Sequence, residues 1–168
     1  LKAAIIGTGG ISNEHIMAYQ KNENVELYVF CDINEKQLNL MAEKYGVHKE
    51  RCFLDKDEML KALPEIDIVS VCTWNSAHAE CTIAALNAGK NVLCEKPMAK
   101  TYAEAKAMYE ASVRTGMKLS IGYQSRWRDD SLYLKQCCEN GDLGEIYYAR
   151  ALAIRRRAVP TWGVFLNE

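Results

Sequence analysis

The residues with the most informative spacing lie close to the start of the chain, where two glycines and a serine follow an apolar run. The run is Ala3–Ile6, and the motif after it is Gly7-x-Gly9-x-x-Ser12. Helical periodicity follows, which predicts a strand, a tight turn and a helix. In that setting the first glycine permits the turn, the second lets the backbone approach a pyrophosphate, and the third position must be small for packing. The amides at the helix start then face the phosphates. A glycine turn without a ligand is the alternative, and the motif alone does not exclude it.

An acidic residue, Asp32, follows a second apolar run, Leu27–Cys31, about 20 residues beyond the glycine turn. A carboxylate at this place can accept hydrogen bonds from both hydroxyls of an adenosine ribose. Its charge would repel a 2′-phosphate, which favours NAD(H) over NADP(H) unless a nearby cation such as Lys36 compensates. The alternatives for Asp32 are a solvated loop carboxylate and a charge at the N-terminus of the next helix.

The elements that must position these residues alternate regularly along the chain. Short apolar runs predict strands over residues 3–6, 27–31, 66–72, 91–94 and 118–121, with helical periodicity between them. The signals for helix ends are Asn34 with Gln37, Gly46, Gly89 after a helix over 77–88, a capping box of Thr101 and Glu104, and Gly116. Strands that are apolar throughout are typical of a sheet covered by helices on both faces. The sequence therefore predicts an α/β fold with a doubly wound, mostly parallel sheet of the Rossmann type.

The composition changes after about Gly122. A helix-like stretch over 130–139 ends at Asn140-Gly141. Over residues 145–157 the side chains alternate in character from one residue to the next, as they do in a strand with one exposed face. We therefore expect a Rossmann domain over 1–122 and the beginning of a second, α+β domain over 123–168. A strand of that length needs partners, which the residues up to 168 do not supply, so we expect the natural protein to continue.

Composition and charge exclude several classes of protein. The formal net charge is -1, so there is no basic excess to bind nucleic acid. No apolar run approaches the roughly 18–20 residues that cross a bilayer, and the chain does not begin with a signal-like segment, so we expect a cytoplasmic protein. The seven cysteines are scattered and never spaced as C-x-x-C. We interpret them as reduced core residues, with no metal or redox role.

Further motifs follow the later strands. In chain order the set is Gly7-Thr8-Gly9-Gly10-Ile11-Ser12, Thr73-Trp74-Asn75-x-x-His78, Glu95-Lys96-Pro97, Gly122-Tyr123-Gln124-Ser125-Arg126-Trp127, Gly144-Glu145-Ile146, Arg155-Arg156-Arg157 and Pro160-Thr161-Trp162-Gly163. This arrangement resembles the glucose-fructose oxidoreductase/inositol dehydrogenase (Gfo/Idh/MocA) family of sugar and polyol dehydrogenases. The resemblance covers essentially the whole chain, and the ordered combination is more specific than any single motif.

The resemblance implies a catalytic role for Lys96. It would lie beside the nicotinamide and the substrate hydroxyl, orient the reacting oxygen and favour its deprotonated form. The alternative is a surface lysine before a proline, but Lys96 follows a predicted central strand at the end where ligands of open α/β sheets bind. Glu95 and Asn75 are implied to hold the nicotinamide ribose or carboxamide, and Pro97 is implied to shape the turn through a cis bond.

Other residues carry less specific expectations. His78 matches a recurrent histidine of the family, with a packed or capping imidazole as the alternative. Arg126 is implied to lie near the cofactor pocket, with a solvated cation beside Asp129 and Asp130 as the alternative. Trp74 departs from the family, which usually has proline there. The full set of expected cofactor-binding residues is Gly7, Thr8, Gly9, Gly10, Ile11, Ser12, Asp32, Thr73, Asn75, His78, Glu95, Lys96 and Arg126.

The resemblance implies an NAD(H)-dependent dehydrogenase that acts on a secondary alcohol of a sugar or polyol such as an inositol. Residues 123–168 would then begin its substrate and oligomerisation domain, and a homo-oligomer is expected. The family's second catalytic motif, an Asp followed by a His, lies beyond this chain, whose histidines are His15, His48 and His78. We therefore expect these residues alone to turn over poorly. The alternatives are a Rossmann methyltransferase, a non-catalytic NAD(H) sensor and an NAD-dependent glycosidase.

Overall fold

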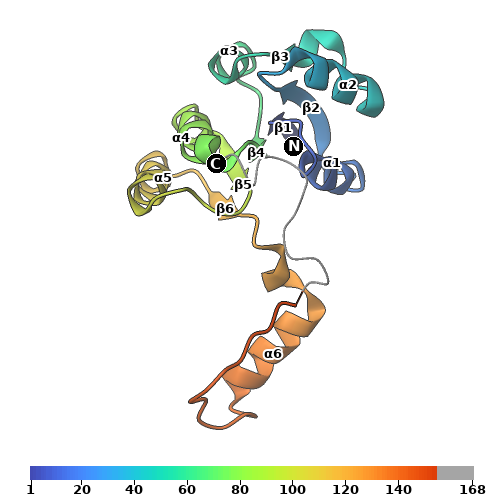
Figure 1. Ribbon diagram of the computed structural model, residues 1–168. Helices are drawn as coiled ribbons and strands as arrows, with labels where there is room; N and C mark the ends of the chain where they lie inside the picture. Colours follow the sequence, from blue (N-terminus) through green and yellow to red (C-terminus); the bar gives the residue numbers. More distant parts are fainter. Residues whose placement is uncertain (155–168) are drawn as a thin grey trace. The chain divides into compact units, whose positions relative to one another are not determined.

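The computed structural model describes residues 1–154, which divide into a first unit, Leu1–Gln124, and a second unit that begins at Ser125. The first unit contains one six-stranded sheet in the order β3-β2-β1-β4-β5-β6, and all of its strand pairs are parallel (Figure 1). The strands are β1 (Lys2–Ile6), β2 (Glu26–Cys31), β3 (Cys52–Phe53), β4 (Ile68–Val71), β5 (Asn91–Cys94) and β6 (Leu119–Ile121). This order is that of a dinucleotide-binding Rossmann sheet, so the predicted fold class is confirmed.

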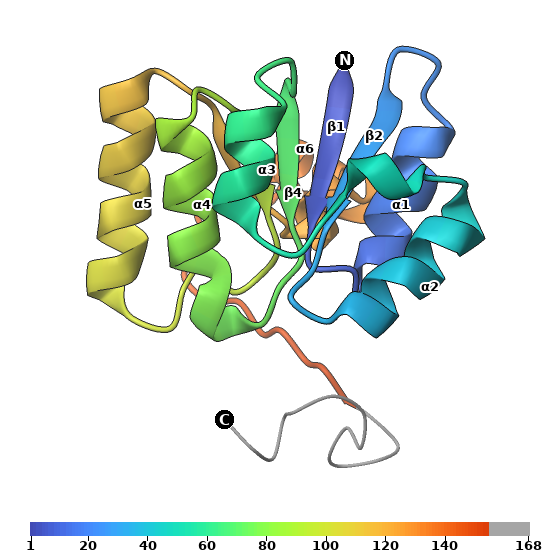
Figure 2. The ribbon, with the colours of Figure 1, turned by 90° about the horizontal axis from the view of Figure 1, so that it is seen from above.

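Helices cover both faces of this sheet. Figure 2 shows α1 (Ser12–Gln20) and α2 (Glu35–Tyr45) on one side, and α3 (Lys56–Ala62), α4 (His78–Asn87) and α5 (Tyr102–Thr115) on the other. Each side has its own apolar core. Ile5, Ile16 and Phe30 are fully buried under α1 and α2, while Val69 and Leu86 belong to the larger cluster under α4 and α5. The central strands β1, β2 and β4 are therefore buried on both faces, as their composition predicts, whereas the edge strands β3 and β6 contain no fully buried residue.

The predicted helix ends are largely confirmed. The Asn34 side chain accepts a hydrogen bond from the Gln37 amide at the start of α2, and Thr101 and Glu104 form a reciprocal capping box before α5. Gly46 and Gly116 take up left-handed conformations directly after α2 and α5. These contacts satisfy backbone groups that the helix itself leaves unpaired, which explains why the elements begin and end at these residues.

Some elements differ from the prediction. The two-residue strand β3, the 3-10 turn η1 (Lys49–Arg51) and the seven-residue helix α3 were not predicted, because segments this short contain too few residues to show a period. Asp55 caps α3 by accepting from the amides of Asp57 and Glu58. The strand predicted over 66–72 is shorter in the structure, and a 3-10 turn, η2 (Asn75–Ala77), precedes α4.

The second unit contains most of the 3-10 turn η3 (Gln124–Trp127) and the helix α6 (Asp129–Asn140), which ends at a left-handed Gly141 as predicted. The strand predicted over 145–157 is wrong for residues 145–154, which form no strand. Side-chain alternation alone does not make a strand, because the backbone groups need a pairing partner, and none lies along them in the described residues. The motifs Arg155-Arg156-Arg157 and Pro160-Thr161-Trp162-Gly163 lie outside the described residues. Among residues 1–154 no helix has the length and apolar character to cross a membrane.

Candidate cofactor and active site

The predicted site residues of the first unit lie at the carboxyl end of the sheet. Gly7 follows β1, Asp32 follows β2, Thr73 follows β4 and Glu95 follows β5. Strands β1 and β4 are neighbours, and the connections from them run to opposite faces of the sheet, toward α1 and α4 respectively (Figure 2). This is the switch point of the fold, where open α/β sheets bind their ligands.

The glycines of the first turn divide into two kinds. Gly7 has a φ of +88°, and a Cβ on it would lie 2.7 Å from the carbonyl carbon of Cys72 and from the nitrogen of Thr73. The protein's own packing therefore requires glycine at this position. Gly9 and Gly10 have neither a positive φ nor any protein atom within 4 Å of such a Cβ. The fold leaves space beside their backbone, which is what a closely approaching pyrophosphate needs.

The third position of the motif is small for the predicted reason. Ser12 is fully buried, and its hydroxyl donates a 2.7 Å hydrogen bond to the carbonyl of Gly9. It opens helix α1, and no side chain caps that helix at Ile11. Asn34, Asp55 and Thr101 cap α2, α3 and α5, whereas no side chain caps α1, α4 or α6. In the first turn of α1 the amides of Asn13 and Glu14 donate to the backbone carbonyls of Gly10 and Ile11, and no side chain covers the positive end of the helix dipole, which can therefore meet an anion.

Asp32 is tied to the glycine turn. Its Oδ2 accepts from both the backbone amide and the hydroxyl of Thr8, at 2.7 Å and 2.8 Å. Its Oδ1 accepts from the amide of Asn34 at 2.8 Å. The Gln37 side chain donates to the Thr8 carbonyl at 2.7 Å, so the start of α2 holds the same turn. A carboxylate has about four acceptor positions, so this half-buried group keeps one free, on Oδ1.

The loop after β4 is joined to the loop after β5 by His78. The imidazole is almost fully buried, with Nδ1 2.7 Å from the Pro97 carbonyl oxygen and Nε2 3.2 Å from the Thr73 carbonyl oxygen. Carbonyl oxygens only accept, so a neutral ring can bond one of them at a time. His78 therefore holds together two loops that carry site residues. Asn75 is half-buried, and its side chain makes no hydrogen bond to another described residue.

Glu95 is the end of a buried chain of polar groups. Its exposed fraction is 7%, and its Oε1 lies 3.1 Å from Nε2 of His15 on α1. The other ring nitrogen of His15 lies 3.0 Å from the hydroxyl of Ser70 on β4, which in turn lies 2.7 Å from the hydroxyl of Tyr19. Oε2 of Glu95 accepts from the backbone amide of Lys96 at 3.1 Å. Both carboxylate oxygens are therefore fixed.

Burial and hydrogen bonding act in opposite directions on Glu95. Burial raises the pKa of this carboxyl, but the hydrogen bond from His15, the amide of Lys96 and the charges of both residues lower it more, so the net pKa lies below its usual range. Glu95 is therefore ionised at neutral pH. Gly122 closes its other side, since a Cβ there would lie 2.7 Å from Glu95 Oε1.

Lys96 has the properties expected of a group that meets a ligand. Its side chain is exposed, and no salt bridge to another described residue holds its ammonium, whereas its backbone is bound to Glu95. The peptide bond between Lys96 and Pro97 is cis, as predicted. The fold thus fixes the main chain of this residue and leaves its side chain free to reach a substrate.

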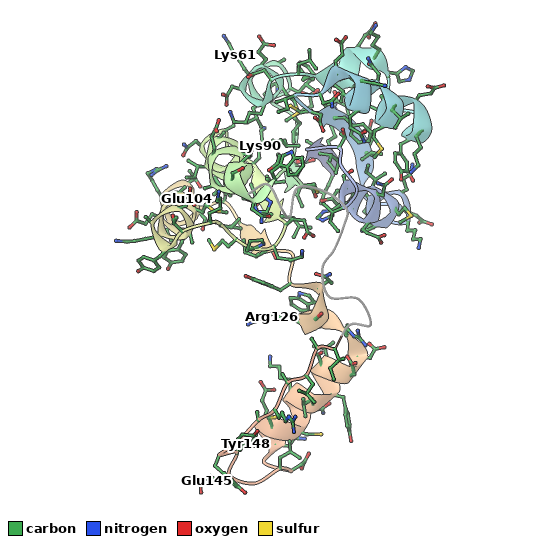
Figure 3. All side chains as sticks on the ribbon, viewed as in Figure 1. Lys61, Lys90, Glu104, Arg126, Glu145 and Tyr148 are labelled. Atoms are coloured by element: carbon green, nitrogen blue, oxygen red, sulfur yellow. The ribbon has the colours of Figure 1, made fainter. Side chains whose placement is uncertain are left out.

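Arg126 belongs to the second unit, where it lies exposed on η3 (Figure 3). Arg128 pairs with Asp130 at 2.9 Å, and the exposed Arg126 is consistent with the alternative of a solvated cation beside Asp129 and Asp130. The contact of Arg126 with a cofactor remains a prediction.

Comparison with known proteins places the chain in a family. The model GFO_IDH_MocA, described as "Oxidoreductase family, NAD-binding Rossmann fold", matches residues 1–123. The chain therefore belongs to this oxidoreductase family, as its motifs predicted. The D-glucoside 3-dehydrogenase of Escherichia coli (strain K12) is 40% identical over 169 residues, covering 100% of this chain and 47% of that protein. The myo-inositol 2-dehydrogenase of Thermotoga maritima is 31% identical over 150 residues, which cover 89% of this chain and 44% of that protein.

A solved structure supports the same assignment. The WlbA dehydrogenase from Bordetella pertussis, solved in complex with NADH and UDP-GlcNAcA, superposes with a TM-score of 0.80 at 30% identity. The alignment covers 88% of this chain and 45% of that chain. The chain thus spans less than half the length of the relatives it matches.

Several residues of the site were missed by the sequence reasoning. His15, Ser70 and the half-buried Tyr19 form the chain of polar groups behind Glu95, and Gly122, whose motif had suggested no such contact, packs against that carboxylate. A serine in the middle of the apolar run 66–72 was the one available signal, because a buried polar side chain needs a hydrogen-bond partner. The identity of that partner depends on how α1 packs on the sheet.

Proposed function

We propose that this chain forms the cofactor-binding part of an NAD(H)-dependent dehydrogenase that oxidises a secondary alcohol of a sugar or polyol. The observation that carries the proposal is the open backbone at Gly9 and Gly10 beside an acidic residue fixed at the end of β2. Neither glycine is required by the protein's own packing, so a ligand is the reason we infer for them. The names of the relatives, a D-glucoside and a myo-inositol dehydrogenase, support the substrate class.

The residues present fit a dinucleotide. The turn over 7–12 and the uncapped start of α1 would hold the pyrophosphate, and the free acceptor position of Asp32 would bind the adenosine ribose. Asp32 also supports NAD(H) over NADP(H), because its charge disfavours a 2′-phosphate. Thr73 and Asn75, in the loop after β4, and Glu95, after β5, would contact the nicotinamide half, with His78 holding the loops between them. The bound cofactor supplies a hydride acceptor.

Lys96 would act on the substrate. An alcohol loses hydride readily only as its oxygen becomes anionic, and a positioned ammonium stabilises that developing charge. The free side chain of Lys96 on a fixed main chain suits this role. The homo-oligomeric assembly, the cytoplasmic location and the division into domains 1–122 and 123–168 stay predictions from the sequence.

The proposal is tested by titrating the chain with NADH, NADPH and S-adenosylmethionine while following cofactor fluorescence or the heat of binding. We expect saturable binding of NADH, weaker binding of NADPH and no binding of S-adenosylmethionine. Absence of binding to both nicotinamide dinucleotides would overturn the proposal.

The catalytic part is tested on the natural full-length protein with glucosides and inositols. Lys96→Ala should lower kcat by about 100-fold or more while the NADH dissociation constant changes by less than about threefold. Lys100→Ala, at an exposed lysine four residues later, is the matched control and should retain full activity.

A further inference from the structure

The hydrogen bonds behind Glu95 have a direction that can be derived from the chemistry of the groups. An ionised carboxylate only accepts, so the Nε2 atom of His15 that faces Glu95 must carry a hydrogen. The Ser70 hydroxyl can donate to the other ring nitrogen or accept from it, and Tyr19 completes the chain in either case. The contact between His15 and Glu95 is therefore a charge-assisted hydrogen bond in both protonation states of the ring.

This contact directly favours the charged form of Glu95, because a donor that bonds a carboxylate oxygen stabilises the ionised group. Burial is the largest single effect on the carboxyl and raises its pKa, and the hydrogen bond from His15 is the largest effect that lowers it. The hydrogen bond from the Lys96 amide alone would not make up for the lowering of the Glu95 pKa that His15 provides. Without the imidazole, a buried carboxyl loses one of its two direct donors, and its neutral form becomes more populated.

The position of Glu95 in the sheet places its charge at the nicotinamide half of the site. Asp32 follows β2, and Glu95 follows β5, which lies three strands away in the order β2-β1-β4-β5. Three strand spacings are about 14 Å. If Asp32 binds the adenosine ribose, the other end of an extended dinucleotide lies toward Glu95. The nicotinamide ring of NAD⁺ carries a positive charge, and that of NADH does not.

We propose that His15 is a positioning residue that keeps Glu95 fixed and ionised, and that this carboxylate thereby favours binding of the oxidised, positively charged dinucleotide over the reduced one. Both ring nitrogens of His15 face protein groups, Ser70 and Glu95, so His15 would act through Glu95. The inference rests on the proposed function, because it assigns the preference to the same dinucleotide site. Beyond that function, the inference identifies His15 as the residue that keeps the Glu95 carboxylate of the site ionised.

The test compares NAD⁺ and NADH affinities of three forms of the chain by calorimetry at neutral pH. His15→Phe removes both ring nitrogens at similar size, and His15→Gln keeps an amide that can donate to Glu95. In His15→Phe we expect the affinity for NAD⁺ relative to NADH to fall by about tenfold. In His15→Gln that ratio should stay within about threefold of the unsubstituted chain.

Two further measurements separate positioning from a general loss of structure. His48→Phe makes the same substitution at an exposed histidine and should leave the ratio unchanged. Glu95→Gln removes the charge directly, so it should lower the ratio as His15→Phe does even if the latter folds poorly. In the unsubstituted chain, nitrogen-15 NMR of the imidazole should show a hydrogen on Nε2 of His15.

The outcomes distinguish this inference from the function on which it rests. If the unsubstituted chain binds neither dinucleotide, the proposed function and the role of His15 are both overturned. If it binds both but His15→Phe or Glu95→Gln leaves the ratio of affinities unchanged, only the role of His15 is overturned. A ring that carries its hydrogen on Nδ1 alone would contradict the hydrogen bond to Glu95 and overturn it as well.

Discussion

Thr8 donates two hydrogen bonds to a single carboxylate oxygen of Asp32, one from its amide and one from its hydroxyl. The first strand's turn and the end of the second strand are thereby locked together before any ligand arrives. A site fixed in advance loses less conformational entropy on binding, so the same contacts give a higher affinity. They also make Asp32 a structural residue as well as a binding residue.

Asp32→Asn should therefore affect stability and cofactor choice together. Both oxygens of Asp32 accept hydrogen bonds, whereas an asparagine side chain has one accepting oxygen and one nitrogen that only donates. Thr8 or Asn34 therefore loses its acceptor, and we expect a loss of about 1–3 kcal/mol in the free energy of unfolding. The affinity for NADH should fall about tenfold, and the affinity for NADPH relative to NADH should rise because the negative charge is gone. Urea denaturation and fluorescence titration measure the two effects.

Glu35→Gln is the matched control for this change. Glu35 lies three residues later, is exposed and also carries a negative charge in the first turn of α2. It should leave the cofactor preference unchanged. Equal effects of both substitutions on the ratio of NADPH to NADH affinity would mean that general charge, and not the ribose contact, controls cofactor choice.

The two kinds of glycine in the turn should respond differently to alanine. Gly7→Ala forces a Cβ to within 2.7 Å of the Cys72 and Thr73 backbones at a φ of +88°, so we expect a destabilisation of about 3 kcal/mol or more. Gly9→Ala meets no protein atom within 4 Å and should cost less than about 1 kcal/mol. Its NADH affinity should nevertheless fall at least about tenfold, because the methyl group occupies space that the pyrophosphate needs.

Denaturation curves together with NADH titrations separate these outcomes. A Gly9→Ala chain that binds NADH as tightly as the unsubstituted chain would show that the cofactor does not approach this backbone. A Gly7→Ala chain of unchanged stability would contradict the close packing of the turn against the loop after β4.

The local parts of this site could be predicted from the sequence, and the non-local parts could not. The spacing of Gly7, Gly9 and Ser12 reflects one turn and one helix start, so it is visible within six residues. The contact of His15 with Glu95 joins residues that are 80 positions apart, and it depends on how α1 lies on β4 and β5. No periodicity within either segment carries that information.

The strand predicted over 145–157 shows the converse limit. Its alternation is regular, yet residues 145–154 form no strand in the described structure. A strand is stabilised by hydrogen bonds to a neighbour, which are a property of the surrounding fold and not of the segment. The parallel strands β1, β2, β4, β5 and β6 of the first unit were predicted, although β3 was missed and β4 is shorter than expected, because turns and helices with clear end signals bring their partners alongside.

The buried cysteines should be inert in the folded chain. Burial raises the pKa of Cys31 to about 12 and the pKa values of Cys81 and Cys94 to about 11, so almost no thiolate forms at about pH 8. Iodoacetamide should therefore label the exposed Cys138 first, and the denatured chain should be labelled at all seven cysteines. Peptide mass spectrometry measures this order. Labelling of Cys31 or Cys94 as fast as Cys138 would contradict the described core.

Glu95 should make the stability of the first unit depend on acid pH. Its pKa in the folded chain lies below the ordinary glutamate value of 4.5, so its contribution to stability is complete above that pH and is lost as the pH falls through the lowered folded value. The difference in unfolding free energy between the unsubstituted chain and Glu95→Gln should thus be largest near neutral pH and shrink below 4.5. Urea denaturation at a series of pH values gives this difference.

The exposed carboxylate of Glu43 supplies the comparison for that experiment. Glu43 lies on the outer face of α2 and accepts no hydrogen bond from another described residue, so Glu43→Gln should change stability little and by the same amount at every pH. A pH profile for Glu95→Gln as flat as this one would mean that His15 and the Lys96 amide do not lower the pKa of Glu95. The charge assigned to the nicotinamide half of the site would then lack its physical basis, because a carboxyl buried without effective donors is neutral over more of the pH range.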